Sequence, residues 1–185
     1  MTKFLKFGIL LLTITLMNCS KSTDDEATEN NSSQIVKATL DGQAWTATKI
    51  TSANVIRYAS LGRQRFDIIA EDASQRISIS CEGSLSANNS VDIKTYTFDS
   101  ESEELGDALF TNVYIVGTGS IGFHIPRTGI LTITSVNTTN KTISGTFSFT
   151  SERNDSPEVT SPPSPLVFKG TNGVFTNVKY TVLDL

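Results

Sequence analysis

The chain has few of the side chains on which metalloenzymes and disulfide-rich proteins depend. Its 185 residues include one histidine and two cysteines, Cys19 and Cys81. One histidine without clustered cysteines cannot build a zinc site of a common type. If Cys19 has another role, as argued below, no second thiol remains for an internal disulfide with Cys81. The composition therefore predicts no metal centre, and no motif predicts a cofactor.

Positive charge is scarce as well. There are 15 Lys and Arg against 19 Asp and Glu, which gives a net charge of −4, and the basic residues form no stripe along the sequence. Nucleic acid-binding proteins meet phosphates with clustered Lys and Arg. Nucleic acid is therefore not an expected partner.

Long apolar runs are absent. The longest, Phe7 to Met17, has about 11 residues, whereas a transmembrane helix needs about 20. This run follows Lys3 and Lys6 and precedes Asn18-Cys19. A basic start followed by a short apolar segment is typical of a secretory signal, so residues 1–18 are predicted to be a signal peptide.

The segment Thr15-Leu16-Met17-Asn18-Cys19 resembles a bacterial lipobox, although Asn18 is larger than the usual Gly, Ala or Ser. The resemblance implies acylation of Cys19 and a membrane anchor. Residues 19–34 would then be the acylated cysteine and a flexible tether, because they are polar and low in hydrophobicity. The acidic trio of residues 24–26 resembles the export signal of lipoproteins on the outer cell surface. A plain solvated linker is the alternative, and surface or periplasmic orientation stays open.

From Ile35 onward the sequence has the pattern of an all-β domain. Short alternating runs are broken by turn residues about every 8–12 positions, which is typical of a sandwich or barrel. The domain, residues 35–185, is predicted to be an antiparallel two-sheet β-sandwich, with a closed β-barrel as the alternative. The expected strands are 35–40, 44–50, 55–60, 65–70, 76–81, 92–98, 108–117, 121–125, 130–136, 141–150, 166–170 and 174–183.

In two of these strands, the alternation of apolar and polar residues predicts which side chains are buried. In residues 141–150, Ile143, Gly145, Phe147 and Phe149 alternate with Ser and Thr, as in a sheet with one dry and one wet face. In residues 76–81, Cys81 shares the apolar face of Ile77 and Ile79. Its thiol is therefore expected to be buried and inert.

Four segments together resemble a family of short Bacteroidetes-type lipoproteins known only as a domain of unknown function. They are Asp41-Gly42-Gln43-Ala44-Trp45, Gly129-Ile130-Leu131-Thr132, Gly145-Thr146-Phe147-Ser148-Phe149 and Asn172-Gly173-Val174-Phe175. The resemblance spans roughly residues 35–183. It supports the fold and the cellular address, and it carries no activity or catalytic residue.

The segments that match enzyme motifs in sequence do not predict an active site. Gly117 to Gly122 matches a dinucleotide-binding motif, but that motif needs a strand followed by a helix, and here a hairpin turn is expected. His124 alternates away from Ile121, Phe123 and Ile125 and is expected to face water.

The acidic loop Asp99 to Asp107 is the remaining polar candidate. Asp99, Glu101, Glu103 and Asp107 could supply oxygen ligands to calcium, although the glycine and flanking helices of an EF-hand are missing. The same loop could supply a pair of carboxylates to a glycosidase. A solvated loop is the simpler interpretation.

The strand 108–116 is apolar on both faces. Phe110, Tyr114 and Val116 share one face, while Leu109, Val113 and Ile115 share the other. Such a strand is either covered on both sides or lines a binding surface. Because aromatic side chains are enriched where proteins bind, Phe110 and Tyr114 are candidates for a binding face.

These patterns predict a membrane-anchored lipoprotein of the outer membrane, on the cell surface or facing the periplasm. Its partners would be the membrane, through the lipid, and an unidentified protein or glycan. The β domain is expected to be a non-enzymatic binding or interaction module. The alternative is a carboxylate-dependent hydrolase that acts on extracellular glycans.

Overall fold

The computed structural model describes residues 33–102, 108–116, 119–153 and 165–185, and for residues 109, 111–116 and 119–123 it describes the backbone alone. The predicted signal peptide, Cys19 and most of the tether therefore lie outside the described residues. The strands are β1 (Ile35–Leu40), β2 (Gln43–Thr46), β3 (Lys49–Tyr58), β4 (Arg63–Glu71), β5 (Gln75–Ser84), β6 (Thr95–Asp99), β7 (Ala108–Val116), β8 (Gly119–Asn137), β9 (Thr142–Arg153), β10 (Val167–Lys179) and β11 (Thr181–Asp184). Within these ranges the helical content is one 3-10 turn, Ala59–Leu61.

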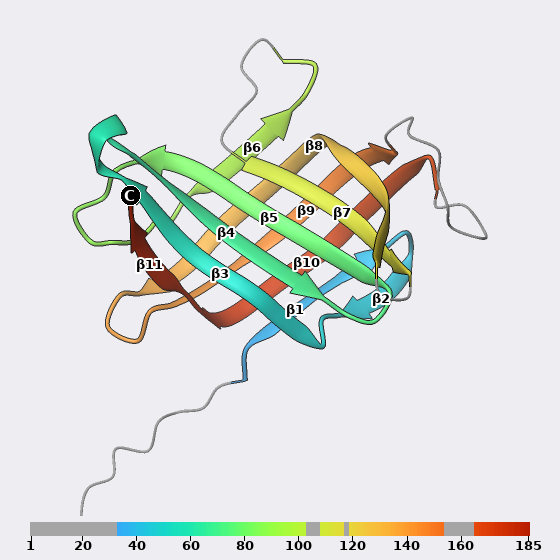
Figure 1. Cartoon of the computed structure of the whole chain (residues 1–185), viewed down its shortest axis with the longest axis horizontal. Coiled ribbons are helices and arrows are strands. Elements are labelled where there is room, and N and C mark those ends of the chain that lie inside the picture. Colours follow the sequence, from blue (N-terminus) through green and yellow to red (C-terminus); the bar gives the residue numbers. More distant parts are fainter. Residues whose placement is uncertain (1–32, 103–107, 117–118, 154–164) are drawn as a thin grey trace, which may run out of the picture. The chain divides into compact units, whose positions relative to one another are not determined.

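The strands form two layers that pack face to face, which confirms the predicted all-β sandwich. Their hydrogen-bonded order is β11-β3-β4-β5-β7-β8-β9-β10-β1-β2, with β6 added on β8. Figure 1 shows β3, β4, β5 and β7 lying across β8, β9, β10 and β1. The order has two ends, β11 and β2, so the strands do not close into a barrel. All pairs are antiparallel except β11 with β3, which is parallel.

The turn chemistry places the first hairpin as expected. Asp41 and Gly42 have φ of 45° and 80°, which is the left-handed backbone that a two-residue turn between twisted strands requires. The Asp41 side chain also accepts a hydrogen bond of 2.7 Å from the backbone N–H of Lys169. The turn is therefore tied to β10.

Strand β8 runs straight through the segment that the sequence predicted as a break. The expected strands 121–125 and 130–136 are both parts of β8, and Pro126 lies inside it. Pro126 is paired with Ser151 of β9. On the other side of β8, the pairing with β7 extends as far as His124, and the pairing with β6 begins at Thr128. Proline lacks an N–H donor, and it occupies the gap between these two neighbours, where no ladder needs one.

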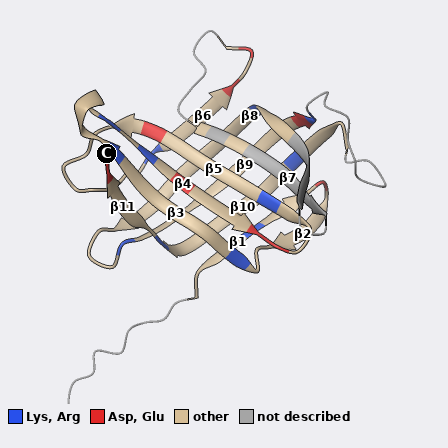
Figure 2. Ribbon diagram, viewed as in Figure 1, with Lys and Arg blue, Asp and Glu red and all other residues tan. Residues whose placement is uncertain are grey.

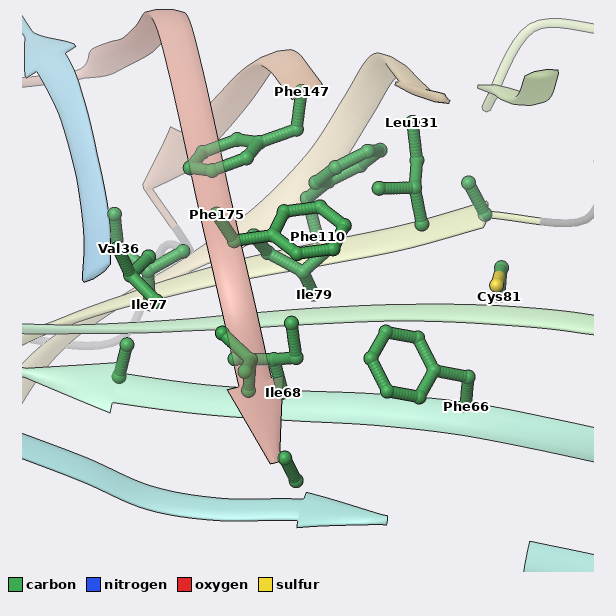
Figure 3. Packing of buried hydrophobic residues seen from close by; sticks show 14 of the residues in the cluster. Val36, Phe66, Ile68, Ile77, Ile79, Cys81, Phe110, Leu131, Phe147 and Phe175 are labelled. Carbon is green, nitrogen blue, oxygen red and sulfur yellow. The ribbon is translucent and has the colours of Figure 1, made fainter. Parts of the chain in front are cut away.

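The core lies between the layers and is dominated by phenylalanine and isoleucine. Figure 3 shows Phe66 and Ile68 of β4 facing Phe175 of β10, and the rings of Phe66 and Phe175 are 6.5 Å apart. The predicted facing of β9 is confirmed, since Ile143, Phe147 and Phe149 are buried. Cys81 is also buried, at 1% exposure, as its alternation with Ile77 and Ile79 predicted.

Four glycines on the inner face allow phenylalanine rings to lie flat against the sheet. A Cβ at Gly129, Gly145, Gly170 or Gly173 would overlap a ring of Phe110, Phe175, Phe149 or Phe147, in that order. Three of the pairs are cross-strand neighbours: Gly145 with Phe175, Gly170 with Phe149, and Gly173 with Phe147. The rings cover backbone that glycine would otherwise leave bare, as in aromatic rescue of glycine in designed sheets.

Candidate binding surface

The outer side of β6, β8, β9 and β10 is a continuous polar surface without charge at its centre. Register places Thr95 opposite Thr132, Thr132 opposite Thr146, and Thr146 opposite Val174. A second row runs from Thr97 to Ile130 and Ser148. We call this surface the hydroxyl face and define it as Thr95, Thr97, Ile130, Thr132, Thr146, Ser148 and Val174.

The hydroxyl face follows directly from alternation along β9. Because Ile143, Gly145, Phe147 and Phe149 point inward, the Ser and Thr residues between them point outward. Neighbouring strands are about 4.8 Å apart, so the hydroxyls stand in regular rows. Thr95 and Thr132 share a hydrogen bond of 3.0 Å between their Oγ1 atoms. Figure 2 shows that the charged residues are dispersed over the strands, with the body of β9 uncharged.

A shallow depression of about 450 Å³ lies in this face. It is lined by Ile130, Thr146, Ser148, Asn172 and Val174, together with Phe147 and Gly173. Ile130 is 51% exposed. The depression therefore offers a few hydroxyl and amide groups within a mainly apolar lining, which is the composition of a site that fixes a ligand by a few polar contacts.

A bulge in β10 forms one wall of the depression. Sequence reasoning placed a turn at Thr171-Asn172-Gly173 between two strands, but β10 continues through it. Register shifts against both β1 and β9 at this point, and Asn172 has a φ of 50°. One extra residue is accommodated here, which bends the strand locally. The Asn-Gly pair was the available signal, and it is compatible with either a turn or a bulge.

His124 is in the core, so the prediction that it faces water is wrong. Its side chain is fully buried, its Nε2 lies 2.8 Å from the carbonyl oxygen of Pro165, and its ring is 5.6 Å from that of Phe168. The reason is a second bulge, between Pro126 and Thr128. One extra residue reverses the alternation of β8. His124, before the bulge, therefore points to the same inner side as Leu131 and Ile133 after it.

Phe110 is also in the core, so its prediction as part of a binding face is wrong. The ring is fully buried and stacks on Phe149 at 5.4 Å, with an interplanar angle of 10°. It reaches from β7 across to the opposite layer, where Gly129 leaves room for it. The side chain of Tyr114, the other member of that predicted face, lies outside the described residues.

The acidic loop is described only at its start. The Asp99 side chain accepts a hydrogen bond of 3.0 Å from the backbone N–H of Glu101, while Glu103 and Asp107 lie outside the described residues. In the part of the chain that the structure covers, no three His, Cys, Asp or Glu side chains gather as metal ligands would. In the match to a dinucleotide-binding motif, Gly119 to Gly122 lie in β8, which pairs antiparallel with β7, while Gly117 and Thr118 lie outside the described residues.

Several of the carboxylates that the structure describes on the strands lie beside arginine. Glu71 is 2.8 Å from Arg76 and 3.5 Å from Lys49, and Asp67 is 2.7 Å from Arg65. The hydrogen bond from Arg76 lowers the pKa of Glu71 below its ordinary value of 4.5, with smaller contributions from Thr51 and Lys49 and against an opposing effect of burial. A general acid needs the opposite shift.

Comparison with known proteins identifies the family. A family described as a domain of unknown function, DUF6252, matches residues 32–179. The chain belongs to this family. No curated protein and no solved structure matches the chain. Membership of DUF6252 implies no activity, so a function has to be argued from the residues. Within the described ranges, no helix combines the length and apolar character that a bilayer crossing would require.

The segments on which the family resemblance rested are structural in this member of DUF6252. Gly145 and Phe147 of β9 interlock with Phe175 and Gly173 of β10, each glycine receiving the ring of the opposite strand. These residues join β9 to β10 within their layer and face the core. The hydroxyl face is built from the residues between them.

Proposed function

We propose that the chain is a lipoprotein, anchored through an acylated Cys19 at the outer membrane and displayed on the cell surface. Its β domain would be a non-enzymatic binding module. The observation that carries the proposal is the order of the first 35 residues: Lys3 and Lys6, an apolar run, Cys19, a polar acidic segment, and then a folded β domain that begins at Ile35.

The lipid anchor accounts for attachment without a membrane-spanning segment. Each buried methylene contributes about 0.8 kcal/mol, and a single acyl chain gives only marginal binding. The lipoprotein resemblance implies several chains on Cys19. Together these hold a domain stably at a membrane.

The positions of the reactive side chains support binding over catalysis. Cys81 and His124 are buried in the core, and Glu71 has a pKa that is lowered, with an arginine beside it. Catalysis needs a nucleophile, an acid–base pair or a metal at an accessible site. The described residues do not bring such groups together.

The hydroxyl face supports an uncharged partner. Rows of Thr and Ser hydroxyls donate and accept hydrogen bonds, and Ile130 and Val174 add apolar contact at the depression. A polymer of uncharged sugars or an uncharged protein surface fits this chemistry. The lack of a basic stripe makes nucleic acid a poor fit.

Metabolic labelling with palmitate tests the anchor. Cys19→Ser should lose the label and move from the detergent phase to the aqueous phase or remain unprocessed. Cys81→Ala is the matched control, because it removes the only other thiol and should keep the label. Unchanged labelling and partitioning of Cys19→Ser would refute the anchor.

Binding to an array of neutral and anionic glycans tests the binding module. Neutral glycans should be retained, and Ser148→Asp should abolish their retention while Ser148→Ala keeps it. Retention confined to anionic glycans would contradict the proposed chemistry. Hydrolysis of any glycan on the array that disappears in Glu103→Gln would overturn the non-enzymatic role and favour the hydrolase.

A further inference from the structure

A second surface lies beside β11, at one end of the strand order. We call it the seam groove. It has a volume of about 510 Å³ and is lined by Thr48–Asn54 together with Gln34, Val36, Ala47, Lys179 and Thr181. It lies outside the hydroxyl face, on residues of β1, β3, β10 and β11.

Half of one strand edge is open in this groove. β11 pairs with β3 only along Asn54–Arg57. In the described part of the chain, Lys49–Ala53 pair with β4 on one side and with no strand on the other. β10 ends at Lys179 on β9, and the chain then crosses at Tyr180 to β3. Among the described residues, the crossing leaves the first five residues of β3 without a strand on their second side.

An open strand edge is a template for another extended chain. Its N–H and C=O groups are spaced to continue the ladder, and peptide recognition by strand addition uses such edges. Five residues of strand span about 17 Å at about 3.4 Å per residue. The free edge is therefore long enough to pair with a short peptide segment.

The charge of the groove selects among peptides. Lys49 and Lys179 line it, and none of its lining residues is acidic, although acidic residues outnumber basic ones in the chain. The side chain of Lys49 is 65% exposed beside Glu71, which is also bonded to Arg76. Arg76 offsets the charge of Glu71, so Lys49 keeps the capacity to attract a second carboxylate.

We propose that the seam groove binds an extended acidic peptide of a partner protein, which adds as a strand along Lys49–Ala53. Main-chain hydrogen bonds to β3 give the affinity, and carboxylates beside Lys49 and Lys179 give the preference. This site goes beyond the binding module proposed above, because it uses a different surface and a different class of ligand.

Two features of the edge disfavour a second copy of the chain as the occupant. A pair of copies joined edge to edge would bring the lysines of both grooves together, and like charges directly opposite are destabilising. The register of β3 also shifts between Ile50 and Ser52. Such a bulge discourages the long regular pairing that joins sheets into aggregates.

Titration with synthetic peptides, followed by amide chemical shifts of the mature chain, tests the proposal. The probes are a peptide of about seven residues that alternates valine with glutamate, its counterpart with lysine, and a fully N-methylated form of the first. The glutamate peptide should shift the amides of Lys49–Ala53. The lysine peptide should not bind, and N-methylation should remove binding because it removes the N–H donors.

Charge reversal provides the second measurement. Lys49→Glu should weaken binding of the glutamate peptide about fivefold, whereas Lys169→Glu, a lysine of β10 outside the groove, should leave it unchanged. Equal binding of the glutamate and lysine peptides, or undiminished binding after N-methylation, would overturn the proposal. So would dimer formation, seen by sedimentation, that shifts the amides of Lys49–Ala53. Results on the glycan array do not bear on any of these outcomes.

Discussion

Replacing Gly145 with alanine tests whether neighbouring strands of one layer are held at a fixed distance. A Cβ at this position would overlap the backbone carbonyl oxygen of Thr132 and the ring of Phe175. A ring can turn aside, but the carbonyl belongs to the β8–β9 ladder and cannot move without breaking strand pairing. Forcing extra atoms into a packed site costs about 1–3 kcal/mol, and we expect the upper end here.

An opposing effect reduces the net loss. Alanine restricts the unfolded chain more than glycine does, which stabilises by about 0.4–1 kcal/mol. The net destabilisation expected for Gly145→Ala is therefore about 2 kcal/mol, or a fall in Tm of about 4–8 °C for a domain of this size. Gly83→Ala is the matched control, since nothing lies within 4 Å of its added Cβ.

Urea unfolding followed by fluorescence measures the difference. Trp45 is the one tryptophan of the chain and is 6% exposed, so unfolding changes its surroundings. The midpoint should fall for Gly145→Ala and stay or rise for Gly83→Ala, with the same slope for both. Equal midpoints would mean that β8 and β9 yield to the extra methyl, and the argument from fixed strand spacing would be wrong.

The other predictions concern the core, the buried histidine and one ion pair. Phe149→Ala should cost about 3–5 kcal/mol, while Ser148→Ala, its outward neighbour, should change stability by no more than about 0.5 kcal/mol; equal losses in urea would show that the facing of β9 is wrong. His124→Ala should cost about 2–4 kcal/mol through lost packing and a lost hydrogen bond, and a change near zero in calorimetry would restore the water-facing assignment. Because the folded-state pKa of Glu71 is lowered, its charge stabilises the fold above pH 4.5, and this contribution disappears as the pH falls through the folded-state pKa. Glu71→Gln should therefore be less stable than the parent chain at neutral pH and equal to it in acid. A difference in stability that persists in acid would exclude the ion pair with Arg76 as its cause.

Period-two alternation predicted the fold class and the facing of strands without bulges. In β9 and β5 it placed Phe147, Phe149 and Cys81 correctly, because these segments keep one residue per step throughout. Alternation failed for His124 because a bulge lies between that residue and the rest of β8. A single extra residue changes no composition and leaves little trace in a sequence.

The candidate surfaces were harder to predict than the fold. Phe110 has the character of an interface residue, and only the stacking on Phe149 shows that its partner is inside the molecule. The hydroxyl face was visible in residues 142–150 as alternating Ser and Thr, but its width depends on which strands are neighbours. The seam groove depends on the pairing of β11 with β3, and no local pattern records a contact between segments so far apart in the chain.

The pairing of the first strand with the last ones constrains how the protein reaches its folded state. The side chain of Gln34 accepts a hydrogen bond from the backbone of Lys179, 145 residues later, and β1 is flanked by β10. If the chain is exported as proposed, it leaves the translocation channel N-terminus first and cannot complete its sandwich until nearly all of it has emerged. Such non-local pairing folds slowly, in about milliseconds to seconds. The polar, acidic residues before Ile35 would keep the early strands in solution during that interval, when their edges are bare.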